Sequence, residues 1–161
     1  MSDRSNEAPG ASLLGWWRRL SAKPFGKMLF SRMVGRTAPY TGSIGARVEL
    51  LEPGHAIWTL RDRRGVRNHL RSVHAVALVN LAEVTSGTAM LTALPPRTRG
   101  IVTALGMTYL KKARGTLTAE CRCTLPPITG ETKIEVQADI KDAAGDVVAR
   151  GVVTWLVAPV T

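Results

Sequence analysis

The sequence predicts an α+β fold in which a curved antiparallel sheet of about six strands wraps around one long central helix. Two observations lead to this prediction. The run 72–91 is apolar on every side, which is typical of a helix that is buried all round. The segments before and after it alternate apolar with polar residues, which indicates antiparallel strands with one face in water. A sheet of this size hides its apolar face by curling around the helix.

The composition fits one globular unit with a basic surface. The chain has 161 residues, of which 45% are hydrophobic, and this is enough for a single domain with a core. The formal net charge of +10 attracts anions such as acidic lipids or phosphorylated small molecules. Nucleic acid is an unlikely partner, because Lys and Arg are spread along the chain and no nucleic-acid motif occurs.

The cysteines indicate neither a disulfide nor a metal site. Cys121 and Cys123 lie two apart on a predicted strand, so they share a face and are poorly placed to bond each other. Since the sequence also lacks a secretory signal pattern and a long apolar span, we expect a cytoplasmic protein.

Three segments follow one another along the chain. Residues 1–11 are predicted to be a disordered tail, residues 12–36 a helical segment, and residues 37–161 the sheet-and-helix domain. The helical segment contains two short amphipathic stretches, the second opening at Pro24. It is rich in basic residues and contains Trp16 and Trp17, whose role the sequence leaves open. Packing on the domain is favoured over weak contact with a membrane surface, because Pro24 and Gly26 interrupt any single amphipathic run.

The strands are predicted in two groups around the long helix. Residues 44–51 and 56–62 form a hairpin whose turn contains Pro53 and Gly54. Ser72 is a candidate cap for the start of the helix, and Pro95 ends it. Four strands then follow at 101–111, 116–123, 133–140 and 147–157.

The long helix and the loop before it contain the candidate catalytic residues. Glu83 is the one charge in the apolar run, and a lone buried carboxylate must be paired, protonated or facing a cavity such as a subunit interface. Backbone N–H groups at the start of a helix are unpaired and lie at the positive end of its dipole. Ala75 and its neighbours are therefore candidates to bind an oxyanion.

A family resemblance connects these residues. The order Asn68, His74 six residues later and Glu83 nine further on resembles the Asn…His-Gly-Gly…Asp/Glu pattern of PaaI-like hotdog-fold thioesterases, over about residues 42–156. The resemblance implies hydrolysis of acyl-CoA thioesters, with Glu83 as nucleophile or general base. It further implies that His74 opens the helix, that the N–H of Ala75 binds the thioester carbonyl, and that Asn68 positions water or the carboxylate.

The resemblance also bears on partners and on the acyl group. In the family these groups meet across a dimer interface, which implies a homodimer or a dimer of dimers. Coenzyme A would be part of the substrate, with no retained cofactor. Two departures concern the substrate: Ala75-Val76 replaces Gly-Gly and narrows the approach to the thioester, and Glu83 replaces the shorter Asp. The sequence does not fix the length of the acyl chain.

A basic cluster after the third predicted strand is the candidate binding site for the phosphates of coenzyme A. It consists of Lys111, Lys112 and Arg114, and its alternative reading is a solvated turn.

Other readings of the candidate residues stay open. His69 lies fourteen residues before Glu83, the spacing of the catalytic pair in hotdog hydroxyacyl dehydratases, although the His-Phe-Pro-Gly motif of those enzymes is absent. A hotdog module that binds acyl-CoA or a partner without catalysis is a further alternative. In structural terms, Glu83 could merely pair with an Arg across a dimer contact, His74 could only cap the helix, and Asn68 could be an ordinary loop residue.

Overall fold

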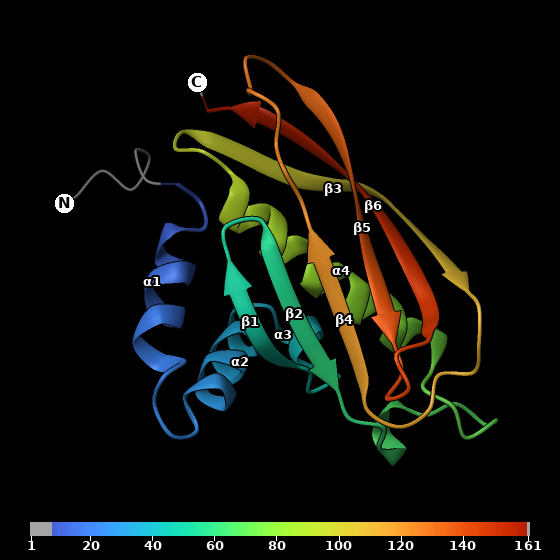
Figure 1. The fold of residues 1–161 in the computed structure, drawn as a ribbon. Coiled ribbons are helices and arrows are strands. Elements are labelled where there is room, and N and C mark those ends of the chain that lie inside the picture. Colours follow the sequence, from blue (N-terminus) through green and yellow to red (C-terminus); the bar gives the residue numbers. More distant parts are fainter. Residues whose placement is uncertain (1–7, 161) are drawn as a thin grey trace.

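The computed structural model describes residues 8–160, and it has the predicted α+β architecture (Figure 1). Most of the predicted tail, residues 1–7, lies outside the described residues. Its last residue, Ala11, begins the first helix rather than ending a tail. The helices are α1 (Ala11–Leu20), α2 (Gly26–Thr37), α3 (Pro39–Gly42), the 3-10 helix η2 (Arg64–Val66) and α4 (Ala75–Ala93).

Six strands form one antiparallel sheet, as the alternation of residues predicted. Their order across the sheet is β1-β2-β4-β5-β6-β3, so β1 and β3 are the two edges. The strands are β1 (Arg47–Glu52), β2 (His55–Leu60), β3 (Thr98–Tyr109), β4 (Leu117–Arg122), β5 (Thr132–Lys141) and β6 (Val147–Pro159). Figure 1 shows the sheet curving around α4, with α1 and α2 beside the β1 edge.

Helix α4 lies in the core, and this confirms the central helix that the sequence predicted. Most of its side chains from Ala77 to Thr92 are buried, polar ones such as Thr85 and Thr88 included. These hydroxyls donate to backbone carbonyls one turn earlier in the helix, so their burial leaves no donor unpaired. The indole N–H of Trp58 on β2 donates to Thr88 over 3.0 Å and links helix to sheet.

The start of α4 differs from the prediction. The cap is His74 rather than Ser72, because the His74 ring nitrogen Nδ1 accepts the N–H of Val76 over 3.1 Å. The hydroxyl of Ser72 instead donates to the carbonyl of Ala113, far along the chain. The sequence shows the local candidates for a cap, whereas this long-range partner exists only in the folded chain.

The N-terminal helices pack on the domain through one face each. The rings of Trp17 on α1 and Phe30 on α2 meet edge to face with centroids 5.2 Å apart, and both side chains are buried. Helix α2 begins at Gly26, two residues after the predicted start at Pro24. A side chain at Gly26 would collide with the carbonyl oxygen of Leu20, so the turn between the helices requires glycine there.

Close packing between β6 and α4 gives a test of this arrangement. A Cβ added at Gly151 would lie 2.7 Å from Cβ of Ala82 and 3.1 Å from Sδ of Met107. We predict that Gly151→Ala lowers the free energy of unfolding by about 1–3 kcal/mol through overpacking, as measured by urea denaturation. Gly106→Ala is the matched control, since no atom lies within 4 Å of its Cβ position. Equal effects of the two substitutions would contradict the packing of α4 against β6.

Candidate functional site

The loop before α4 is held in shape by its own hydrogen bonds. The side-chain oxygen of Asn68 accepts the N–H groups of Leu70 and Ser72, and the backbone N–H of Asn68 donates to the carbonyl of Ser72. Arg67 and Val73 form an isolated bridge across the base of the loop. Asn68 therefore organises the loop through its oxygen, while its amide nitrogen donates to no other described residue.

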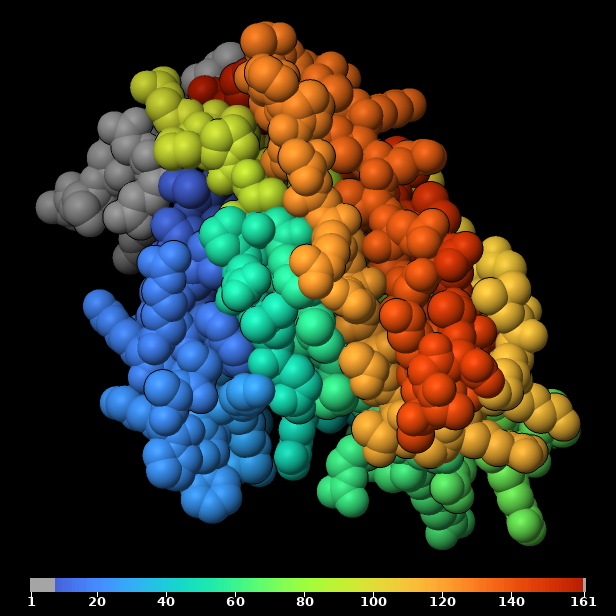
Figure 2. Space-filling view, in the orientation of Figure 1, coloured from blue at the N-terminus to red at the C-terminus, as the bar shows by residue number. Residues whose placement is uncertain are grey.

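The same loop is attached to the segment that follows β3. The backbone N–H of Val73 and the hydroxyl of Ser72 both donate to the carbonyl of Ala113, each over 2.8 Å. Asp62 forms an ion pair with Arg67 and accepts the N–H of Gly115. These two interactions lower the pKa of Asp62, that of Arg67 most strongly, so the carboxylate stays charged. Figure 2 shows the loop (green) at one end of the molecule.

This attachment fixes the N-terminus of α4. The ring of His74 caps the helix by accepting from Val76, and the carbonyl of His74 accepts from Leu78. The N–H of Ala75, the first residue of the helix, donates to no acceptor within residues 8–160. It is thus an unpaired donor at the positive end of a helix that is apolar and mostly buried.

Glu83 lies on the one stripe of α4 that the sheet leaves uncovered. The stripe includes Val76, which is 50% exposed, and the partly exposed Val79 and Glu83. The carboxylate of Glu83 forms no ion pair or hydrogen bond with another described residue. Burial raises the pKa of Glu83, because the charged form is poorly solvated.

Two residues near Glu83 each have a buried polar side-chain atom without a partner. They are Oδ1 of Asn80, one turn before Glu83, and Nε1 of Trp155 on β6, and they are the two such atoms among the described residues. Gly87, one turn after Glu83, lies close to both Glu83 and Trp155: a Cβ there would lie 3.6 Å from Oε1 of Glu83 and 3.6 Å from Cζ2 of Trp155. An unpaired acceptor and an unpaired donor are therefore buried in the same region as Glu83.

Asn80 also borders a cavity beside the start of α4. Its amide nitrogen donates to the carbonyl of Tyr40 over 3.0 Å, and the side chain is 6% exposed. The cavity has a volume of about 260 Å³, and its walls include His74, Val76 and Asn80. Neither Asn80 nor Trp155 was a candidate from the sequence. The one available signal for Asn80 was an amide side chain in an otherwise apolar run.

The candidate residues do not all meet within one chain. Ala75 and Glu83 are separated by eight residues of helix, which corresponds to about 12 Å along the axis. A thioester carbon is attacked from about 3 Å and its oxygen is bound at a similar distance, so these two groups of one chain cannot act on the same carbonyl. His69 is exposed in the loop and forms no hydrogen bond with another described residue.

The basic cluster after β3 divides into two parts. Lys111 forms ion pairs with Asp142 and Asp146, over 2.9 and 2.6 Å, at the turn between β5 and β6. Its hydrogen bonds to Asp146 and Asp142 raise the pKa of Lys111 well above its ordinary value, so its charge is held by two carboxylates. Lys112 and Arg114 are exposed, form no ion pair with a described residue, and flank Ala113, which holds the loop before α4.

The cysteine thiols are not arranged as nucleophiles. Both cysteines are free, and burial raises the pKa of Cys121 to about 12. Burial also raises the pKa of Cys123. Because the thiolate is the reactive form, neither thiol is activated. Within residues 8–160, no three His, Cys, Asp or Glu side chains gather as a candidate metal site.

Several solved structures of other proteins have a fold similar to that of this chain. A structural-genomics crystal structure is 32% identical, with a TM-score of 0.78, and the match covers 89% of this chain and 95% of that one. A Pseudomonas aeruginosa protein described as a probable thioesterase is 24% identical, with a TM-score of 0.73 and coverage of 85% and 97%. A Haemophilus influenzae thioesterase is 17% identical, with a TM-score of 0.68 and coverage of 85% and 93%. No curated protein matches the chain.

The family assignment rests on residues 26–157, which match the model of the family described as "Domain of unknown function (DUF4442)". This match spans α2 to β6 and so includes the loop before α4 and both ends of the candidate site. The chain therefore belongs to the DUF4442 family, and it has a hotdog fold.

Proposed function

We propose that this protein hydrolyses acyl-CoA thioesters in sites that two copies of the chain complete together. The observation that carries the proposal is the pair of unsatisfied groups on α4: the unpaired carboxylate of Glu83 and the unpaired N–H of Ala75. Thioester hydrolysis needs a base or nucleophile, which the carboxylate would be, and a donor to the oxyanion, which the N–H would be. Because about 12 Å of helix separates them, a second copy must supply one of the two.

The reaction follows from these roles. The ionised carboxylate of Glu83 takes a proton from water, whose oxygen attacks the thioester carbon. Alternatively, the carboxylate itself attacks that carbon, the thiolate of coenzyme A leaves, and water then hydrolyses the mixed anhydride and supplies the proton. The carbonyl oxygen becomes an oxyanion, which accepts a hydrogen bond from the N–H of Ala75. The bond between carbon and sulfur then breaks, and the electron pair leaves with the sulfur of coenzyme A, which takes up the proton. The products are a carboxylic acid and free coenzyme A.

The β3 edge is the surface through which we expect the two copies to pair. Strand β3 has 12 residues and is hydrogen-bonded on one side to β6. Ile101 on it is 65% exposed, and its inner residues Val102, Leu105 and Met107 are partly exposed. A long, open strand edge with exposed apolar residues can pair with a strand of another chain. Two-fold pairing there would bring a partner toward the uncovered stripe of α4, since Tyr109 at the end of β3 contacts the carbonyl of Ala75.

Basic and polar groups near the loop before α4 are the candidates to bind coenzyme A. Lys112 and Arg114 carry free positive charges next to the loop that precedes α4, and phosphates bind such groups. Lys111 is a weaker candidate, because two carboxylates already hold it. The unpaired Oδ1 of Asn80 lies close to the cavity beside the helix start, where an amide N–H of the pantetheine arm could donate to it.

Removing either group should abolish hydrolysis without unfolding the protein. Glu83→Gln should lower kcat/KM by at least about 100-fold. Ala75→Pro deletes the N–H, and the fold should accept it: Ala75 is the first helical residue, and His74 before it has φ −64° and ψ 140°, which proline favours. We expect a loss of about 100-fold or more from this change as well.

The measurement is free-thiol release from short, medium, long and aromatic acyl-CoAs. Ala75→Gly, which keeps the N–H, and His69→Ala should both retain activity within a few-fold. Loss of activity in His69→Ala would instead support the dehydratase-like use of His69. If the wild type releases no thiol from any thioester, the hydrolase proposal is wrong.

The environment of Glu83 predicts a gain in stability when it is neutralised. Below its ordinary pKa of 4.5, Glu83 is protonated in both the folded and the unfolded chain. As the pH rises further, the unfolded chain ionises first, so the wild type loses stability until the raised folded pKa is passed. Glu83→Gln should therefore be more stable than the wild type at neutral pH, with the difference vanishing below about pH 4.

Urea unfolding as a function of pH checks this expectation. The matched control is Glu131→Gln, at an exposed carboxylate that forms no ion pair with a described residue. It should show no comparable gain. A Glu83→Gln variant that is less stable than the wild type at neutral pH would mean that the carboxylate has a stabilising partner.

A further inference from the structure

Helix α2 has a buried face and an outward face of different character. Phe30 and Gly26 lie in the buried face. The outward face carries Leu29, Arg32 and Arg36, whose spacing of three and four residues places them along one line of the helix, and Phe25 is the exposed N-cap before it. Two apolar side chains therefore stand at its beginning and two arginines toward its end.

The apolar part of this face is unusually exposed. The side chain of Phe25 is 80% exposed, and that of Leu29 is 54% exposed. Phe25 also has a left-handed backbone conformation, with φ 60°, which is unfavourable for a residue with a side chain of this size. The turn from α1 holds it there, because Gly26 packs against the carbonyl of Leu20. An aromatic ring is thus kept in solvent at the tip between the two helices.

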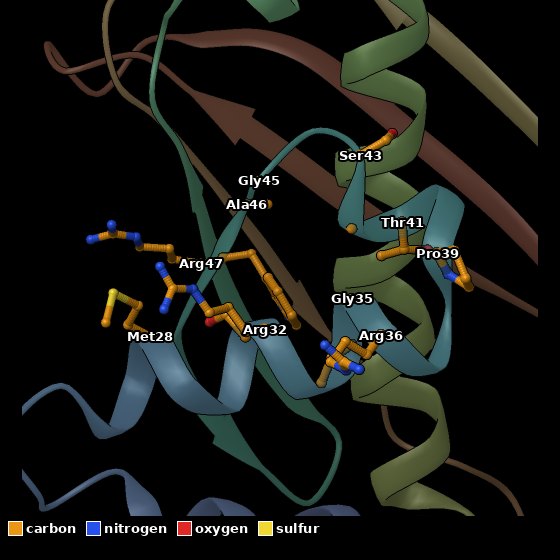
Figure 3. A pocket seen from close by; sticks show the side chains of 14 residues that line it. Met28, Arg32, Gly35, Arg36, Pro39, Thr41, Ser43, Gly45, Ala46 and Arg47 are labelled. Carbon is orange, nitrogen blue, oxygen red and sulfur yellow. The ribbon is translucent and has the colours of Figure 1, made fainter.

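The basic part of the face borders a cavity with a volume of about 780 Å³. Arg32 and Arg36 project from α2, and Arg47 projects from the start of β1 (Figure 3). The side chains of these three arginines form no hydrogen bond or ion pair with another described residue, and no acidic residue lines the cavity. Its wall includes the apolar side chains of Met28 and Trp58.

The sequence around this face has one sign of charge. Seven Lys or Arg residues and no Asp or Glu lie between Glu7 and Glu49. Lys27 is one of the seven, and it is paired with Glu49 over 3.1 Å. The remaining positive charges create a positive electrostatic potential on the side of the molecule formed by α1 and α2. Figure 2 shows these two helices in blue, the colour of the N-terminal part of the chain.

We propose that the outward face of α2 docks on an anionic lipid bilayer. Phe25 and Leu29 enter the interface between headgroups and acyl chains, while Arg32, Arg36 and Arg47 bind lipid phosphates around the cavity. A bilayer offers apolar and anionic groups side by side, as this face requires. A second copy of the chain is disfavoured as the occupant, because two-fold pairing would set the same positive charges against each other. The face lies beside the β1 edge, opposite β3, so docking does not depend on the proposed hydrolysis or dimer.

Vesicle flotation with the full chain tests the proposal. The wild type should bind vesicles of equal parts phosphatidylcholine and phosphatidylglycerol, bind phosphatidylcholine alone far less, and dissociate at about 0.5 M NaCl. Arg32→Gln with Arg36→Gln should weaken binding about 25-fold, since each basic residue near an anionic surface contributes about fivefold. Phe25→Asn with Leu29→Gln should weaken binding at unchanged charge, and asparagine tolerates the left-handed conformation at position 25.

The matched control removes two positive charges elsewhere. Arg99→Gln with Lys133→Gln changes exposed residues on β3 and β5 and should bind vesicles nearly as well as the wild type. Circular dichroism reports whether each variant is folded. Equal weakening by the two charge-removing pairs would overturn the proposal, because binding would then follow net charge. Absence of binding to anionic vesicles, or tighter capture of duplex DNA that depends on Arg32 and Arg36, would also overturn it.

Discussion

The burial of α4 is the constraint on which the rest of this structure depends. A helix that is apolar on every side cannot lie on a surface, so the sheet must curve until it covers as much of the helix as one chain allows. The cover is incomplete along the stripe that includes Val76 and Glu83. This stripe adjoins the end of β3, itself an unprotected edge. In the proposed dimer, a second copy of the chain would cover both the helix stripe and the strand edge.

The same constraint gives Glu83 its chemistry. A carboxylate on an exposed helix would be fully hydrated, and one in the closed core would need a partner. On the stripe it is half-buried and unpaired, in a region that also contains the unpaired Oδ1 of Asn80 and Nε1 of Trp155. Each of these groups costs stability in the free monomer.

The fold could be predicted from the sequence further than the site could. In strands such as β5, apolar and polar residues alternate strictly, and α4 is an apolar run too long for a strand. Both elements can therefore be predicted from their own residues. Of the two caps that the sequence offered for α4, His74 is confirmed, whereas Ser72 is held by Ala113, a contact that only the folded chain creates. Lys111 looked free in the sequence, whereas Asp142 and Asp146 reach it across the sheet. Trp155 gave no signal at all, since a tryptophan on an alternating strand is indistinguishable from an ordinary core residue.

The central claim, that two copies complete each site, can be tested by subunit complementation. Glu83→Gln and Ala75→Pro chains would be unfolded together, refolded as a mixture and assayed for thiol release. If each site combines the Glu83 carboxylate of one copy with the Ala75 N–H of the other, a mixed dimer keeps one of its two sites intact. The mixture should then recover about a quarter of wild-type activity, since about half of the dimers are mixed. A mixture as inactive as its two components, in dimers shown to be mixed, would place both groups in one chain and contradict this account.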